Sequence, residues 1–261
     1  MRLISHIDLL LILSRVRELY GLDTTKAIPS ILIPQLRDFN VQLDRWGAAW
    51  STKLPRNRWL GNFPSEAVKL HWRFAKFYIC SYVFRGMNPV SSPSSASTTL
   101  SSDLKDISTA AVTTAISTLQ LLIDSEELQA NLVGVPHYFH TMFAFAAVFL
   151  LKAATRFIHI PVDTKLIFKV SKQVLEIFRQ CSCARQHLVH RIAQGLKKMI
   201  EQCESQVPVD VDGHIPVGNH SYGDTAGGLS NINTGANDMQ WFDMENFDLL
   251  SMPPPADFLG P

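Results

Sequence analysis

Apolar residues recur every three to four positions along most of the first 205 residues of this chain. This spacing places them on one face of an α-helix, whereas a half-buried strand would alternate apolar and polar residues. No run of alternating residues is long enough to predict a strand. The predicted helices span residues 5–20, 29–51, 65–85, 103–129, 136–158, 162–180 and 184–204. The sequence therefore predicts an all-α, multi-helix domain.

One predicted helix, 136–158, is apolar on most of its faces. Its most apolar stretch, Thr141 to Leu151, is far shorter than the roughly 20 residues that a membrane-spanning helix needs. Histidine and proline precede this stretch, and Lys152 follows it. We expect a central helix buried in the protein, and no membrane contact.

Two stretches interrupt the helical pattern. Residues 86–102 contain Gly86, two prolines and many serines, and residues 207–237 contain six glycines and a single aromatic residue. Such segments bury too little apolar surface to offset the entropy of ordering, so both are predicted to be mobile. The predicted organisation is a helical domain at 1–205, a flexible linker at 206–237 and a disordered acidic-aromatic tail at 238–261.

Charge divides the chain in the same way. Up to Lys198 there are 24 basic and 13 acidic residues, a net charge of +11, whereas the remainder has 10 acidic residues and neither Lys nor Arg, a net charge of −10. A basic body followed by an acidic tail indicates two parts with different roles.

The tail interleaves acids with large apolar side chains. Repulsion between the acids keeps the apolar groups in water, where a partner with an apolar groove and a basic rim binds them, often as an induced helix. The predicted anchors are Trp241, Phe242, Met244, Phe247, Leu249 and Leu250, among the acids Asp243, Glu245 and Asp248. The alternative is a tail that folds back onto its own basic body.

Catalytic motifs are absent from the sequence. There is no nucleophile elbow, phosphate-binding loop, dinucleotide fingerprint or zinc-protease motif, so we predict no enzyme, no catalytic residue and no cofactor. Cys183, His187 and His190 would share one face of the helix predicted at 184–204, a spacing that suits zinc. No fourth ligand is evident, so we expect a buried cysteine beside exposed histidines and no metal.

Other polar residues have both structural and functional interpretations. His137 and His140 begin the most apolar helix, where they either line a ligand pocket or bond a neighbouring loop; we favour the loop. Lys69, Arg73 and Lys76 form a basic stripe, which either contacts nucleic acid or is the solvated edge of an amphipathic helix. We favour the solvated edge, because the chain has no nucleic-acid-binding motif.

Cysteine use and the N-terminus indicate an intracellular protein. The four cysteines, Cys80, Cys181, Cys183 and Cys203, do not have the spacing of a disulfide framework, so we expect reduced thiols. His6 and Asp8 interrupt the apolar N-terminal stretch, which therefore does not read as a signal peptide.

Several segments resemble a known family. They are QLDRWGAAWSTKLP with its Trp46/Trp50 pair, LHWRFAKFYICSYVFRGMNP, the serine-rich insert, and VPHYFHTMFAFAAVFLLKAATRF. Together they resemble the C-terminal half of the helical middle region of fungal zinc-cluster (Zn2Cys6) transcription factors, and are similar to the protease-regulating activators of filamentous fungi. The resemblance covers about residues 5–205.

The resemblance implies a nuclear protein that regulates transcription, with coactivators as partners of the tail and homodimers in the full-length family. These factors bind DNA through six cysteines that hold two zinc ions, and this chain has four cysteines at other spacings. Zinc and DNA are therefore expected only at a module absent from these residues. Two alternatives are a helical scaffold without a transcriptional role and a helical enzyme, although the enzyme would need clustered aspartates for magnesium, which are absent.

Overall fold

The computed structural model describes residues 2–21, 23, 26–54, 56, 58–85, 102–156, 162–184 and 186–206. Within these ranges every regular element is helical, which confirms the all-α prediction. The helices are α1 (Arg2–Tyr20), α2 (Ile33–Ser51), α3 (Phe63–Ser81), α4 (Ser102–Asp124), α5 (Glu126–Asn131), α6 (His137–Arg156), α7 (Thr164–Gln180) and α8 (Leu188–Gln206), with short 3-10 turns at Ser30–Leu32 and Tyr82–Phe84.

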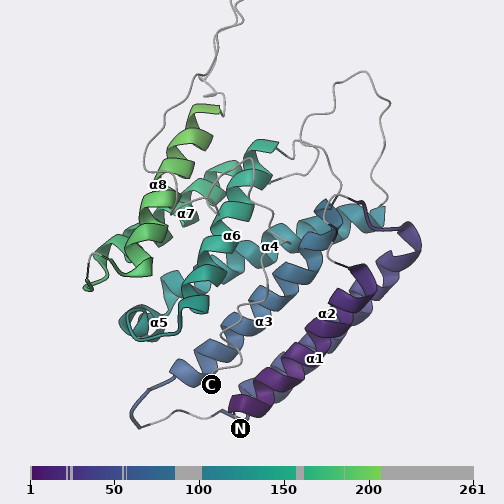
Figure 1. Cartoon of the computed structure of the whole chain (residues 1–261), viewed down its shortest axis with the longest axis horizontal. Helices are drawn as coiled ribbons and strands as arrows, with labels where there is room; N and C mark the ends of the chain where they lie inside the picture. The colour runs from purple at the N-terminus through teal and green to yellow at the C-terminus, as the bar shows by residue number, and fades with distance from the viewer. Residues whose placement is uncertain are drawn as a thin grey trace, which may run out of the picture.

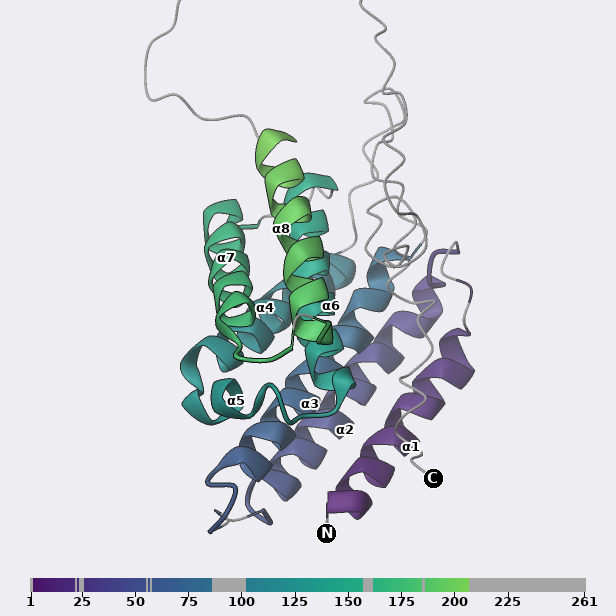
Figure 2. The same cartoon turned by 60° about the vertical axis from the view of Figure 1, so that its left-hand side comes forward.

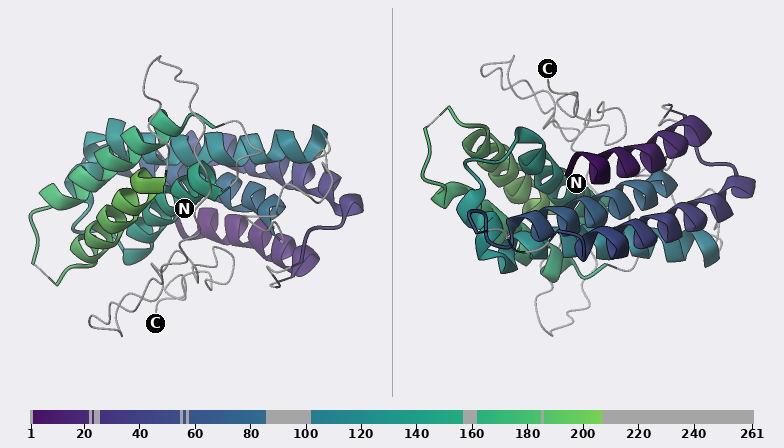
Figure 3. Two further views of the ribbon diagram at one scale, coloured as in Figure 1. Left: turned by 90° about the horizontal axis from the view of Figure 1, so that it is seen from above. Right: turned by 90° about the horizontal axis from the view of Figure 1, so that it is seen from below.

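The helices pack in an order that largely follows the chain. Helices α1, α2 and α3 lie side by side, and α3 packs against α4 on its other side (Figures 1 and 2). Helix α4 then contacts α6 and α7, and α8 packs on both α6 and α7. Seen from above and below, α1 forms one outer edge of the molecule (Figure 3).

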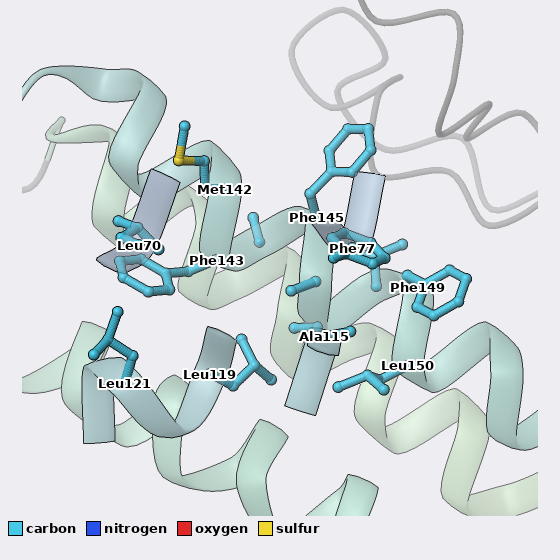
Figure 4. Packing of buried hydrophobic residues seen from close by; sticks show 14 of the residues in the cluster. Leu70, Phe77, Ala115, Leu119, Leu121, Met142, Phe143, Phe145, Phe149 and Leu150 are labelled. Carbon is cyan, nitrogen blue, oxygen red and sulfur yellow. The ribbon is translucent and has the colours of Figure 1, made fainter. Parts of the chain in front are cut away.

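A large part of the core lies between α3, α4 and α6. Figure 4 shows buried apolar side chains that these three helices contribute, among them Leu70, Leu119 and Phe143. The Phe77 ring of α3 lies 4.9 Å from that of Phe149 in α6, and both are buried. Side chains that water does not reach at all include Leu70, Phe77, Ala115, Leu119, Phe143 and Leu150.

Helix α6 supplies the centre of this core. Two of the described helices, α4 and α6, are long and apolar enough to cross a membrane, a test that core helices of soluble proteins also pass. In α6, 72% of the apolar window is buried inside the protein. Its all-round apolar composition is thus matched by neighbours on its faces, as predicted for a central buried helix.

Helices α2 and α3 approach closely at Gly47. A Cβ atom at this position would lie 2.9 Å from the indole ring of Trp72, so only glycine fits without moving the ring. Asp44, one turn earlier, accepts hydrogen bonds from Trp72 Nε1 at 3.2 Å and from Lys76 Nζ at 2.7 Å. The predicted Trp46/Trp50 face is buried in the same contact region, and Trp46 Nε1 donates to the carbonyl of Ser5 in α1.

A buried arginine that follows α3 and its 3-10 turn forms hydrogen bonds with the end of α1. Arg85 is 3% exposed and donates hydrogen bonds to the carbonyls of Tyr20 and Gly21, at 2.8 and 3.1 Å. Its guanidinium lies 3.8 Å from the ring centroid of Tyr82. Gly21 ends α1 at φ +66°, and its N–H bonds the carbonyl of Arg17. The last carbonyls of α1 therefore have charged or backbone donors.

Several predicted helix boundaries were wrong. The helix predicted at 103–129 is divided, because Ser125 has extended backbone and its side chain accepts from Leu128 N as the N-cap of α5. Helix α3 spans Phe63–Ser81 rather than 65–85, and α2 begins at Ile33 rather than at 29. Helix α8 begins at Leu188 rather than at 184.

The predicted mobile segments lie almost wholly outside the described residues. These are 86–101, which belong to the serine-rich insert, and 207–261, which comprise nearly all of the predicted linker and the tail. Residue 102, the last of the insert, is the first residue of α4. The mobility of both segments and the domain boundaries stay predictions.

Candidate functional site

The predicted anchors of the tail, Trp241, Phe242, Met244, Phe247, Leu249 and Leu250, lie outside the described residues. The described part of the helical body contains a pocket of about 490 Å³. It lies at the end of the molecule where α1 and α3 begin (Figure 1). Its walls come from α1, α2, α3, the α2–α3 loop and the segment from the end of α5 to the start of α6.

Most of the side chains that line the pocket are apolar, and several of them are buried. Trp46, Phe63, Val68 and Phe139 line it and are all buried. The rings of Phe63 and Phe139 stack with their centroids 5.9 Å apart. A pocket with this volume and lining is typical of sites that bind an apolar ligand or side chain.

Two histidines provide the main polar groups of the pocket. His71 of α3 is 2% exposed and its Nδ1 hydrogen-bonds the carbonyl of Ala67 one turn earlier. Because a carbonyl only accepts, Nδ1 of His71 carries the proton, and in the neutral ring Nε2 is then an acceptor. His6 Nε2 lies 3.2 Å from His71 Nε2 and donates to it.

The pocket lining reaches the protein surface at two apolar residues. On α1, Leu3 lines the pocket and is 68% exposed, and Ile4, Ile7 and Leu11 form an exposed apolar stripe on the same helix outside the lining. On the α2–α3 loop, Leu60 lines the pocket and is 38% exposed.

The same loop carries three basic side chains near the lining residues Leu54 and Leu60 in sequence. Lys53 Nζ lies 4.7 Å from the ring centroid of Trp50, and Arg58 lies 5.3 Å from that of Trp59. Arg56 is exposed on the same loop. No described residue forms an ion pair with any of these three cations.

A second histidine cluster lies where α6 begins. His140 is fully buried, and its Nε2 donates to the carbonyl of Leu132 at 2.8 Å, which confirms that it bonds the neighbouring loop rather than a ligand pocket. The rings of His137 and His187 lie 6.2 and 5.4 Å from that of His140. Burial, and to a smaller degree the neighbouring His187 and His137, lowers the pKa of His140, while its bond to the Leu132 carbonyl opposes this shift.

The Cys183, His187 and His190 arrangement was wrongly predicted. Cys183 and His187 precede α8, so the three residues do not share a helix face. Cys183 Sγ lies 3.3 Å from His190 Nε2, but His187 packs against His137 and His140. In the part of the chain that the structure describes, no three His, Cys, Asp or Glu side chains are placed to hold a metal ion.

Each basic side chain of the α3 stripe forms an ion pair or a hydrogen bond with another residue of the protein. Lys69 pairs with Glu66 at 2.8 Å, Lys76 pairs with Asp44 at 2.7 Å, and Arg73 Nη1 donates to the carbonyl of Ser117 in α4 at 2.6 Å. These contacts favour the structural interpretation of the stripe over a nucleic-acid interface.

Sequence reasoning did not identify the pocket or its histidine pair. His71 follows Leu70 on the buried face of α3, and a histidine on such a face is a signal of a buried polar contact. His6 drew attention only as an interruption of an apolar stretch. Their proximity follows from the packing of α1 against the other helices, and periodicity alone does not give that information.

Comparison with known proteins gives one informative match. The chain is 32% identical over 250 residues to the "Transcriptional activator of proteases prtT" of Emericella nidulans. The match covers 91% of this chain and 36% of that protein, so the chain spans about a third of its relative's length. No model of a known protein family matches the chain, and no solved structure matches it.

This relative agrees with the resemblance carried by the tryptophan pair and the apolar helices. The agreement extends beyond those motifs, because the match includes nine-tenths of the chain. The chain is therefore similar, over almost its whole length, to a protease-regulating transcriptional activator of a filamentous fungus.

Proposed function

We propose that this chain is the regulatory and activation part of a fungal RNA polymerase II transcription factor that acts in the nucleus. The helical body is the regulatory domain, and residues 238–259 are the activation segment. The observation that carries the proposal is the 32% identity to a transcriptional activator of proteases over nine-tenths of the chain. The proposal includes no catalytic role.

The composition of the tail indicates how it would activate transcription. Apolar anchors such as Trp241 and Phe247 insert into an apolar groove on a coactivator, and the acids between them speed the encounter with a basic rim. Aromatic anchors contribute most of the affinity at such interfaces, whereas single exposed charges contribute mainly to association rate.

DNA binding is assigned to a module outside these 261 residues. The resemblance implies a zinc cluster built from six cysteines, and this chain has four. In the described part of the body these are free thiols, and no group of potential ligands there converges on a metal position. The residues present therefore do not fit the zinc cluster.

The test is a reporter assay in which residues 238–259 are fused to an unrelated DNA-binding domain. The wild-type fusion should activate transcription. Combined replacement of Trp241, Phe242 and Phe247 by Ala should abolish activation, because each aromatic anchor typically contributes about 2 kcal/mol or more. The Asp243→Asn change alone should only weaken activation.

The matched control is the same fusion with Asp243→Asn, Glu245→Gln and Asp248→Asn, which removes charge and leaves every aromatic side chain. Equal expression of all fusions is checked by immunoblot. A silent wild-type fusion, or full activity of the aromatic triple variant, would contradict the proposed activation mechanism and favour a helical scaffold without a transcriptional role.

A further inference from the structure

We propose that the acidic-aromatic tail, residues 238–259, docks in the pocket between α1, α3 and the start of α6, so that the helical body covers its own activation segment. The docking itself follows from the pocket and the tail sequence. Only its consequence for transcription rests on the proposed function.

The form of the pocket suits aromatic side chains on a peptide. Its volume of about 490 Å³ is in the range that holds a drug-sized apolar group, comparable to a pair of aromatic side chains such as Trp241 and Phe242. Leu3 of α1 and Leu60 of the α2–α3 loop line the pocket and are 68% and 38% exposed, so its apolar lining reaches the protein surface. An apolar side chain on a peptide can therefore enter the pocket from the surface.

The charges around the pocket match those of the tail. Lys53, Arg56 and Arg58 lie on the α2–α3 loop, whose Leu54 and Leu60 line the pocket, and they form no ion pair with a described residue. The tail places Asp243 and Glu245 directly after its first aromatic pair and has neither Lys nor Arg. Aromatic residues in the pocket would therefore bring acids toward this basic loop.

The connection between body and tail is long enough. Residues 207–237 lie between the end of α8 and the tail, and 31 residues span at most about 100 Å when fully extended. The longest helix of the body, α4, has 23 residues and is about 35 Å long. The tail can therefore reach the pocket of its own chain without any change in the body.

Charge also favours the tail over a second copy of the body. Up to Lys198 the chain has a net charge of +11, so two such bodies repel one another, whereas the remainder carries −10. An intramolecular partner has the further advantage of a high effective concentration. The chain's own tail is thus the occupant that the pocket and the charges fit best.

The experiment uses the full 261-residue chain with fluorinated tryptophan and ¹⁹F NMR. The Trp241→Phe variant assigns the Trp241 resonance among the five tryptophans. In the wild-type chain this resonance should lack the solvent isotope shift between H2O and D2O, because the docked indole is dry. Leu60→Glu adds a negative charge to the pocket rim and should give Trp241 the full isotope shift of the isolated tail peptide.

The matched control is Ile31→Glu, which places the same charge on an exposed apolar residue at the opposite end of α2 and should leave Trp241 protected. A second variant on the same loop, Arg58→Glu, should act like Leu60→Glu. Unchanged resonances of Trp50 and Trp72, which do not line the pocket, show that each variant is folded.

Three results would overturn the proposal: a solvent-exposed Trp241 in the wild-type chain, protection that survives both loop variants, or protection that disappears on dilution, which assigns the pocket to a second copy. The NMR measurement does not depend on transcription. A docked tail that fails in the reporter fusion therefore rejects the proposed function and leaves the docking intact.

Discussion

Helices α1 and α6 are both apolar, yet they occupy opposite situations in this molecule. Helix α6 is surrounded by α3, α4, α7 and α8, and Phe143 and Leu150 on it are fully buried. Helix α1 lies at the edge and leaves Leu3, Ile4 and Leu11 more than half exposed (Figure 3). Apolar composition thus identifies a helix with apolar faces to bury, but it does not show whether other helices of the described body bury them.

The largest expected contrast is in unfolding free energy. Phe143→Ala in α6 should lower the free energy of unfolding by about 3–5 kcal/mol, because it opens a cavity at a position that is fully buried. Ile7→Ala on the exposed stripe of α1 should change it by less than about 0.5 kcal/mol. Urea unfolding followed by circular dichroism measures both. Similar losses in the two variants would show that the stripe of α1 is buried in solution.

A smaller effect is expected at the attachment of α1. Arg85→Met keeps the apolar bulk over Tyr82 but removes the hydrogen bonds to the carbonyls of Tyr20 and Gly21. The stability should fall by about 2–3 kcal/mol, the usual scale for hydrogen bonds made by a charged group. Amide hydrogen exchange should accelerate in α1 and remain slow in α6.

A control for this variant is Arg37→Met. Arg37 pairs with Asp103 at 2.6 Å, but both side chains are more than half exposed, so its loss should have little effect on exchange. Equal acceleration in α1 and α6 after Arg85→Met would contradict a local attachment and indicate that the two helices unfold as one unit.

The smallest expected effect is a pH dependence at the base of α6. The pKa of His140 is lowered by burial, so the folded protein binds fewer protons than the unfolded chain once the pH falls below the usual histidine pKa of about 6.5. Stability should therefore decline as the pH falls below that value. His140→Gln, which can still donate to the Leu132 carbonyl, should reduce this slope. Urea midpoints at several pH values test it, and an unchanged slope would assign the dependence to other groups.

The helices were predictable where apolar residues are confined to one face of the helix. The stripes of α7 and α8 were found with ends within a few residues, because their buried residues recur at helical spacing and the opposite faces are charged. The break at Ser125 was missed, because the apolar spacing continues through it. There the serine side chain caps α5, while Gln129 donates to the carbonyls of Leu122 and Ile123 at the end of α4.

The candidate site was far less predictable. The pocket depends on how α1, α3 and the start of α6 are brought together, and no local pattern encodes these distances. His6 and His71 are 65 residues apart in the chain, and each alone looks like an ordinary polar interruption of an apolar stretch. The tail anchors, in contrast, are predicted from a local sequence pattern. They lie outside the described residues, so their role stays a prediction.

The contact between Gly47 and Trp72 has a consequence for how this protein can diverge. A methyl group at position 47 would meet the indole at 2.9 Å, so the two positions are not free to change independently. A lineage that gains alanine or serine at 47 must first or simultaneously shrink residue 72 or widen the spacing of α2 and α3. Orthologous sequences should therefore show glycine paired with a bulky aromatic residue at these positions, or a larger residue paired with a smaller one.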